Sequence, residues 1–327
     1  MTAKKYLLLL CPIVLLSSCG STKFAISTGD ENLSSLTKVT DNEEPCINPY
    51  GGDNGKNLFY AACENSYYYN IFKKENAFSA SVIQKTSGKN INTQPAYNAV
   101  IDRIAFRCQN EGSRSSDIYT MSNGKGTALS PITESYDDFE GHPSFSPDGN
   151  LIAYERVAYT YARYTNTASL LFGANNTLII QNSDIWIKNL KTGENTLLGK
   201  GYQPRFSPDG KRIAYVKYSS DAKSCNIWIM ETDGSNTMQI TDAKQGYAFN
   251  PCWSPDGTKI LFESFKKDKK DYDLYVIDLE GNNLKQLTKN KSYDGTPYWT
   301  TDNYIYFTSD RGGKSGKYQI WRFKYYD

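Results

Sequence analysis

The tetrapeptide Ser-Pro-Asp-Gly occurs three times in the chain, each time with similar residues around it. The copies are Pro143-Ser144-Phe145-Ser146-Pro147-Asp148-Gly149, Pro204-Arg205-Phe206-Ser207-Pro208-Asp209-Gly210 and Pro251-Cys252-Trp253-Ser254-Pro255-Asp256-Gly257. A repeat constrains the fold strongly, because every copy must form the same local structure. Pro presets φ at the second turn position, Asp tolerates the third, and Gly takes the left-handed conformation. Each copy therefore predicts a β-hairpin, and we expect the Asp residues to be structural.

Each copy is followed by two short apolar segments and then by an apolar residue paired with Thr. In the second copy these are residues 212–215, residues 226–229 and Ile240-Thr241. The repeating unit is thus expected to be a four-stranded antiparallel meander.

The proline that begins each copy, here called the leading proline, also identifies degenerate copies before and after the three tetrapeptide copies. These prolines are residues 49, 95, 143, 204, 251 and 297, at intervals of 46, 48, 61, 47 and 46 residues. A period in the mid-forties, built of short strands, is typical of a propeller blade. The sequence predicts an all-β, six-bladed β-propeller of four-stranded antiparallel blades.

Only three strands follow the sixth leading proline, so the last blade lacks its outer strand. Near the amino end, residues 33–37 (Leu-Ser-Ser-Leu-Thr) resemble the outer-strand segment at residues 284–288 (Leu-Lys-Gln-Leu-Thr). We expect residues 33–37 to complete the sixth blade, because this closure removes the two exposed sheet edges of an open ring.

The first residues are typical of a secretory signal. Lys4 and Lys5 precede an apolar run at residues 6–16, and small residues lead to Cys19, in an arrangement that resembles a bacterial lipobox. We expect a signal peptide at residues 1–18, a lipid-modified Cys19 that begins a polar tether at residues 19–30, and one propeller domain at residues 31–327. An ordinary signal peptide with an incidental cysteine is the alternative.

Charge and cysteine content narrow the partners. Without Lys4 and Lys5 the formal charge falls from +2 to 0, and no basic stripe favours nucleic acid. Five cysteines follow Cys19, and none of their spacings is that of a metal knuckle. No cofactor or metal is expected, although oxygen-only sites for calcium or magnesium remain open.

A disulfide between Cys46 and Cys63 is one further expectation. If the first hairpin turns about Asn54-Gly55, the two cysteines lie directly opposite each other on an antiparallel pair. A bulge at the turn would shift this register by one residue.

The repeat resembles a known family. The pattern Pro-x-[Phe/Trp]-Ser-Pro-Asp-Gly, followed by Asp184-Ile185-Trp186 in one copy and by Gln286-Leu287-Thr288 in another, is similar to TolB-type propeller repeats from residue 33 to the end. Such repeats occur in the periplasmic propeller protein of the Tol-Pal system and in the amino-terminal propellers of prolyl oligopeptidase relatives. The repeat also resembles that of propeller lyases acting on pectic oligosaccharides. The resemblance implies the fold and leaves the function open.

Candidate binding residues lie just before the leading prolines, where the innermost strands begin around one mouth of the central channel. They are Asp137, Asp138, Glu140, His142, Tyr202, Tyr247, Asn250, Tyr293 and Asp294. Such Tyr, Asp, Asn and Glu side chains suit a peptide or a sugar. His142 is the only histidine in the chain, so a catalytic triad and a multi-histidine metal site are both disfavoured.

The copy that begins at Pro143 carries an insertion near residues 159–181. Tyr161, Tyr164 and Phe172 in this segment are further binding candidates, and the segment is predicted either as a binding loop or as a longer hairpin.

We therefore expect a non-enzymatic, lipid-anchored protein of the bacterial cell envelope, on the outer membrane and facing the periplasm. It would bind a protein or peptide through its loop face and channel mouth. One alternative is a carbohydrate-binding or carbohydrate-cleaving propeller that uses Asp137, Asp138, Glu140 and His142. A structural subunit of an envelope complex is the other.

Overall fold

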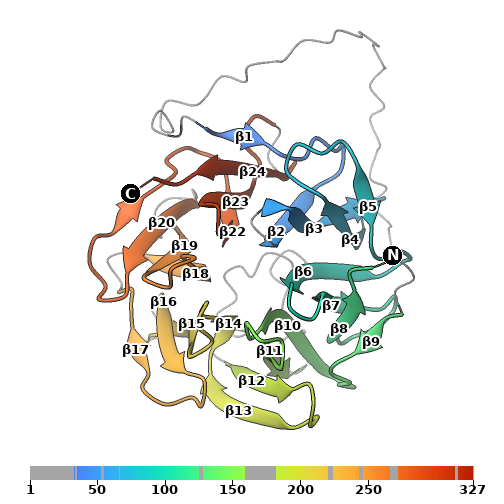
Figure 1. Cartoon of the computed structure of the whole chain (residues 1–327), viewed down its shortest axis with the longest axis vertical. Coiled ribbons are helices and arrows are strands. Elements are labelled where there is room, and N and C mark those ends of the chain that lie inside the picture. The colour runs from blue at the N-terminus through green and yellow to red at the C-terminus, as the bar shows by residue number, and fades with distance from the viewer. Residues whose placement is uncertain are drawn as a thin grey trace, which may run out of the picture.

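The computed structural model describes residue 33 and residues 35–52, 55–65, 67–124, 128–158, 182–219, 224–242, 246–265, 272–313 and 316–326. In these residues the fold is nearly all β, and none of their helical turns is long and apolar enough to cross a bilayer. The strands form small antiparallel sheets set around a central axis, which is the arrangement of a β-propeller (Figure 1). The predicted fold class is confirmed.

The described strands fall into six groups of four, here called the first to sixth blades in the order of their innermost strands. The innermost strands are β2 (Cys46–Gly52), β6 (Ile91–Asn98), β10 (Asp138–Phe145), β14 (Tyr202–Phe206), β18 (Tyr247–Trp253) and β22 (Asp294–Trp299). The second strands are β3 (Asn57–Glu64), β7 (Arg103–Gln109), β11 (Leu151–Ala158), β15 (Arg212–Tyr218), β19 (Lys259–Phe265) and β23 (Tyr304–Ser309).

The outer half of each blade consists of two further strands. The third strands are β4 (Tyr68–Lys74), β8 (Asp117–Ser122), β12 (Ser183–Asn189), β16 (Cys225–Glu231), β20 (Asp273–Asp278) and β24 (Gln319–Lys324). The outermost are β5 (Val82–Gln84), β9 (Ser130–Pro131), β13 (Asn195–Lys200), β17 (Met238–Gln239), β21 (Lys285–Gln286) and β1 (Thr37–Lys38). One parallel bridge, Tyr69 to Ile91, joins the first two blades into an eight-stranded sheet.

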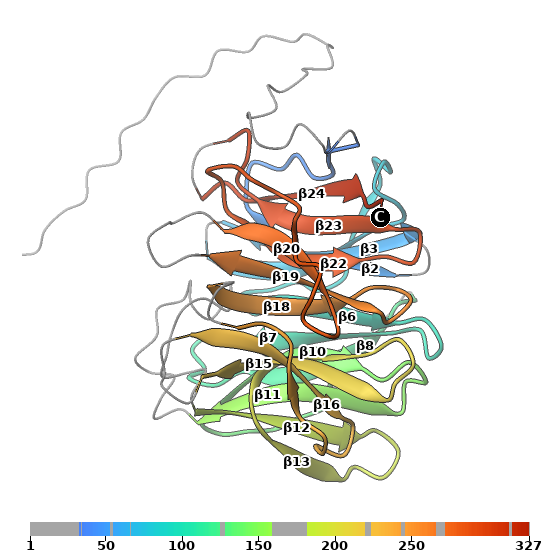
Figure 2. The same ribbon diagram turned by 90° about the vertical axis from the view of Figure 1, so that its left-hand side faces the viewer.

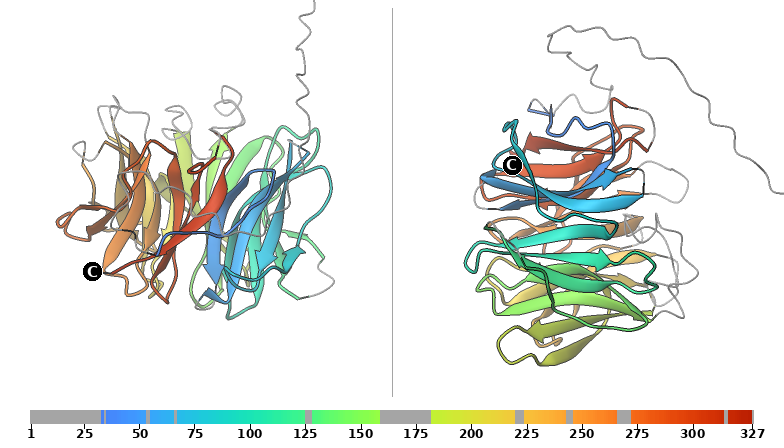
Figure 3. Two further views of the ribbon diagram at one scale, coloured as in Figure 1. Left: turned by 90° about the horizontal axis from the view of Figure 1, so that it is seen from above. Right: turned by 90° about the vertical axis from the view of Figure 1, so that its right-hand side faces the viewer.

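The strands run between two faces of a disc, which Figure 3 (left) shows edge-on. The turn face carries the Ser-Pro-Asp-Gly turns between first and second strands, and the loop face is the opposite one, where the innermost strands begin. In the fourth blade, Asp209 accepts hydrogen bonds from Ser207 Oγ and from the backbone N–H of Lys211, and Gly210 has a φ of 72°. The turn is therefore built by these residues as predicted, and its Asp is structural.

A bulge interrupts every innermost strand at its leading proline. Proline cannot donate a ladder hydrogen bond and is confined to edges and bulges, and the register breaks at this point in β2, β6, β10, β14, β18 and β22. The residue before each proline has a left-handed φ between 47° and 55°; these residues are Asn48, Gln94, His142, Gln203, Asn250 and Thr296. Each innermost strand thus bends at the same point along the axis.

This bulge overturns the predicted register of Cys46 and Cys63. Near the turn the register is as expected, with Tyr50 opposite Phe59, but beyond the bulge Cys46 lies opposite Ala62. The backbone N–H of Cys63 instead donates to the carbonyl of Pro45 at 2.9 Å. The described cysteines are all buried and none of them forms a disulfide.

The ring closes through the amino-terminal segment, as predicted, but with a shifted register. Strand β1 pairs with β24, with Thr37 opposite Arg322 (Figure 1). The apolar–Thr pair that acts like Leu287-Thr288 is Val39-Thr40, three residues later than expected. Thr40 Oγ1 accepts the N–H of Ile320 at 2.9 Å, just as Thr288 Oγ1 accepts the N–H of Leu274 at 2.9 Å.

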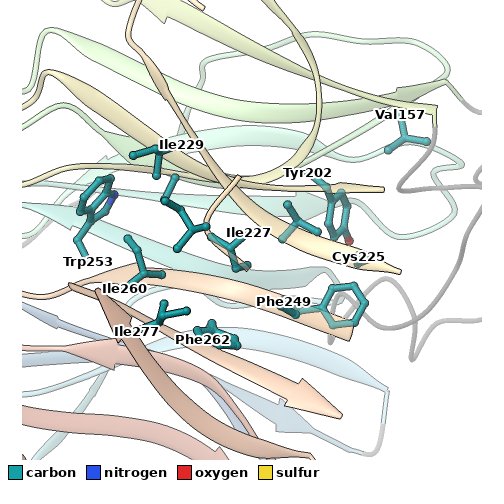
Figure 4. Close-up of a cluster of buried hydrophobic side chains, with 14 of the residues drawn as sticks. Val157, Tyr202, Cys225, Ile227, Ile229, Phe249, Trp253, Ile260, Phe262 and Ile277 are labelled. Carbon is teal, nitrogen blue, oxygen red and sulfur yellow. The ribbon is translucent and has the colours of Figure 1, made fainter. Parts of the chain in front are cut away.

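The core lies between neighbouring blades, which pack face to face (Figure 2). Figure 4 shows one cluster, in which Ile227 of the fourth blade and Ile260 and Phe262 of the fifth are completely buried. Burial of each such side chain contributes about 1.5–3 kcal/mol. These layers hold the innermost strands rigidly around the axis, and so position the side chains that face it.

Candidate functional site

A ring of hydrogen bonds links neighbouring blades at the axis. The N–H groups of five bulge residues, Asn48, His142, Gln203, Asn250 and Thr296, donate to side chains of the preceding blade. That of Asn250 donates to Gln203 Oε1 at 2.7 Å, and that of Thr296 donates to Glu263 Oε2 at 2.6 Å. The left-handed conformation turns these N–H groups out of their own sheet, and the side chains of the neighbouring blade satisfy them. This explains why the six bulge positions carry polar residues.

His142 belongs to this ring. Its Nδ1 lies 2.6 Å from Glu155 Oε1, and its Nε2 lies 3.1 Å from the side-chain nitrogen of Gln94. When Nδ1 donates to the carboxylate, Nε2 accepts from the amide, so both ring nitrogens have partners. The side chain is almost completely buried, which places it inside the channel and below its rim.

The channel is narrow at the level of the bulges. The cavity there has a volume of about 20 Å³ and is lined by Asn48, Gln94, His142, Asn250, Thr296 and their neighbours. Tyr298 also lines this cavity, and its ring packs against that of Tyr50, with the ring centroids 4.2 Å apart. A cavity of this size holds about one water molecule, so a larger ligand has access only to the mouth of the channel.

Glu263, at the fifth position of β19, is a buried carboxylate beside this mouth. Its Oε2 accepts the N–H of Thr296 at 2.6 Å and the hydroxyl of Tyr293 at 3.3 Å, and the Asn250 side chain lies beside it. Burial raises the pKa of Glu263 to about 7, against the weaker lowering by these three donors. Among the described residues no lysine or arginine pairs with it.

Five aromatic side chains form a continuous row on the loop face of the fifth and sixth blades, which we call the aromatic ladder. Its members are Tyr247, Phe265, Tyr272, Tyr293 and Tyr318, and all five are half-buried. Successive ring centroids are 4.9, 4.7, 5.1 and 5.4 Å apart. Half-buried aromatic rings offer a large, rigid contact area at a low entropic cost.

The ladder leads to Glu263, because the hydroxyl of Tyr293 reaches the carboxylate. Phe265 also stacks on the buried Phe249, with an angle of 6° between the ring planes. The ladder is therefore fixed to the core, and one of its rings forms the boundary between the exposed surface and the acidic group.

The structure divides the predicted binding residues into three sets. Tyr247 and Tyr293 lie in the ladder, as just described. His142 and Asn250 lie in the axial ring, and Tyr202 is buried with its ring centroid 5.3 Å from that of His142.

The predicted acidic residues form the third set, and two of them are neutralised. Glu140 Oε1 pairs with Arg156 Nη2 at 2.6 Å, and the carboxylate of Asp294 pairs with Arg311. Asp138 is half-exposed, and Asp137 is exposed on the loop face. Tyr161, Tyr164, Phe172 and Cys19 lie outside the described residues.

Sequence reasoning missed four residues of this site: Glu263, Phe265, Tyr272 and Tyr318. The second strands do contain a signal, because Glu155 and Glu263 both follow an aromatic residue at the same place in the repeat. In the part of the chain that the structure describes, no three His, Cys, Asp or Glu side chains gather as they would around a metal ion.

Comparisons with known proteins agree with this fold. The family model described as the TolB beta propeller domain matches residues 176–267 and 202–325. The structure of TolB from Acinetobacter baumannii is similar, with a TM-score of 0.61 and 17% identity over 84% of this chain and 65% of that one. An oligogalacturonate lyase from Vibrio parahaemolyticus gives a TM-score of 0.59 and 15% identity over 90% of this chain and 95% of the lyase.

Sequence similarity also links part of this chain to a curated protein. The "Uncharacterized peptidase YuxL" of Bacillus subtilis (strain 168) is 27% identical over 108 residues, which are 32% of this chain. This chain spans only 14% of the length of that protein. At these levels of identity the likeness to the solved structures concerns the fold alone.

Proposed function

Because the chain folds as a TolB-type β-propeller, we propose that it is a non-enzymatic binding protein of the bacterial cell envelope, which holds a protein or peptide partner at its loop face and channel mouth. The observation that carries this proposal is the aromatic ladder. Five half-buried rings in contact with one another are typical of the centre of a protein interface, where aromatic side chains supply most of the binding energy.

The state of the acid and base groups supports binding over catalysis. Both nitrogens of His142 have partners, and Glu140 and Asp294 are each held by an arginine. A general base must reach a substrate proton, and a general acid needs a proton to give. In this structure, these groups instead hold the innermost strands and their loops in place.

The amino-terminal sequence supports attachment to a membrane. We propose that Cys19 carries the lipid and that the segment after it tethers the propeller to the outer membrane, facing the periplasm. The insertion with Tyr161, Tyr164 and Phe172 begins after β11, whose end lies at the loop face, so it would extend the same surface.

Site-directed photo-crosslinking in a native envelope preparation tests the proposal. A photoreactive phenylalanine analogue at Tyr247, in the ladder, should give a discrete crosslinked product. The same analogue at Tyr326, which is 64% exposed and lies at the turn face, serves as the matched control and should give none. Equal crosslinking at both positions, or none at Tyr247, would contradict the proposed surface.

A further inference from the structure

The channel mouth between the fifth and sixth blades combines two features. One is a buried carboxylate, Glu263, with no cationic partner among the described residues. The other is the wall of aromatic rings beside it, of which Tyr293 touches the carboxylate directly. A buried charge without a counter-ion is costly, and it is expected to be protonated or paired.

The corresponding acid of the third blade shows what Glu263 lacks. Glu155 occupies the same position of its second strand, and its two oxygens bind the His142 ring and the N–H of Gln203. Glu263 likewise accepts a bulge N–H, from Thr296, but its other neighbours are the neutral groups of Asn250 and Tyr293. Burial raises the pKa of the Tyr293 phenol well above its usual value, so this group stays uncharged.

The nearby charged groups are already engaged. Asp294, on the adjacent strand β22, is neutralised by Arg311, and Arg311 also lies over the Phe307 ring. Arg205, which lines the narrow cavity together with Asn250 and Thr296, donates to the carbonyl of Pro143. Among the described residues, the site beside Glu263 therefore combines an acidic group without a cationic partner and aromatic walls, and the channel below it holds no more than about one water molecule.

We propose that this mouth binds a lysine or arginine side chain of the protein partner, with Glu263 as the counter-ion and the aromatic ladder as the wall of the site. Aromatic faces attract cations, and a carboxylate inside such a wall adds a charge-assisted hydrogen bond. The inference rests on the proposed function and specifies its partner: a basic residue exposed on a peptide or loop enters beside Tyr293.

Binding changes the protonation of the site. The cation replaces the proton on Glu263, so the carboxyl group releases one proton to solvent as the ammonium or guanidinium group arrives. No covalent bond forms. As the pH rises towards the pKa of Glu263, the apparent affinity for the basic side chain should therefore increase about tenfold per pH unit, and above the pKa it should level off.

A pair of short peptides provides the test. The probe is Ac-Gly-Gly-Lys-Gly-Gly-NH2, and its matched control has norleucine in place of lysine, which keeps the alkyl chain and removes the charge. Titration calorimetry with the folded mature protein at pH 8 should give at least tenfold tighter binding of the lysine peptide. At pH 6, repeating the titration in two buffers of different ionisation enthalpy should reveal proton release by the wild-type protein.

Two variants test whether Glu263 is responsible for the preference for lysine and for the proton release. Glu263→Gln should remove the preference for lysine and the proton release, and it keeps the shape of the protonated acid, so the fold should be preserved. Glu280→Gln removes an equal charge from an exposed residue between β20 and β21, which has no part in the proposed site, and should change neither. Equal affinity for the two peptides, or proton uptake in place of release, overturns the proposal even if Glu263→Gln fails to fold. Loss of the Tyr247 crosslink with the lysine preference intact would instead contradict the proposed function.

Discussion

Thr40 is the residue on which closure of the ring can be tested most directly. It is almost completely buried, its Oγ1 accepts the N–H of Ile320 at 2.9 Å, and it donates to Gln319 Oε1 at 2.8 Å. Thr40→Val keeps the shape of the side chain and removes the hydroxyl. The N–H of Ile320 then stays buried without an acceptor, which costs about 1–3 kcal/mol.

A loss of about 2 kcal/mol corresponds to a fall of about 3 °C in the melting temperature of a domain of this size. Differential scanning calorimetry of the mature protein measures it. Thr288→Val breaks the equivalent bond to Leu274 inside the fifth blade and should cost the same. Thr37→Val removes only a hydrogen bond to the carbonyl of Ser35, two residues away, and should have little effect.

The critical result is an equal fall in melting temperature for Thr40→Val and Thr288→Val. It would mean that the bond joining the two ends of the chain contributes as much as the same bond between strands that are close in sequence. A Thr40→Val protein that melts within about 1 °C of the Thr37→Val control would refute the reasoning.

Three further predictions concern other parts of the chain. Burial raises the pKa of Glu263 from 4.5 to about 7, so the folded chain binds this proton more tightly than the unfolded chain does, and the free energy of unfolding should fall by up to about 3 kcal/mol as the pH rises from 4.5 through 7. Urea unfolding at pH 5 and pH 8 measures this fall in the wild-type protein and in Glu263→Gln, which should not show it. The same pH dependence in both proteins would contradict the prediction. Burial raises the pKa of the Cys46 thiol to about 12, so iodoacetamide should not label Cys46 in the folded protein, whereas denaturation should expose it to labelling without any reductant. Mass spectra that show a peptide pair linked through Cys46 and Cys63 would contradict the observed register. Cys19→Ala should release the protein from the membrane fraction or leave it unprocessed, because the lipid is proposed as the anchor; a cleaved form that stays fully in the membrane fraction would argue against lipidation at this residue.

The fold could be predicted because its signals are local. A Pro-Asp-Gly turn specifies its own conformation, and its repetition at a fixed period specifies the arrangement of the units. Register across the bulge could not be predicted in the same way. The leading proline was used as a marker of phase, but its missing N–H also inserts an unpaired residue into the strand, and this moved Cys63 away from Cys46.

The closing strand shows a second limit of local patterns. The sequence contains two apolar–Thr pairs close together, Leu36-Thr37 and Val39-Thr40, and both fit the outer-strand pattern. The choice between them depends on the path from β1 to β2, which only the closed ring determines. The existence of the closing strand was thus predictable, whereas its register was not.

The candidate site was half predictable for a related reason. Tyr247 and Tyr293 precede leading prolines, so the repeat itself placed them at the mouth. Glu263 and Phe265 lie on β19, where nearly every residue is buried, and such a strand shows no alternation from which the channel side could be read. Tyr318 joins the ladder from the far side of the sixth blade, through contacts that arise only from the packing of the blades.

Closure by β1 also means that the ring cannot close before the last strand has been made. Thr40 leaves the ribosome 280 residues before its partner Ile320, an interval of about 14–56 s at usual rates of synthesis. The blades between them can pair strand by strand as they emerge, but residues 37–40 must wait, unpaired, for the last strand. Every incomplete chain is therefore an open array of blades with two free edges, which must be kept from pairing with other chains until the last strand is available.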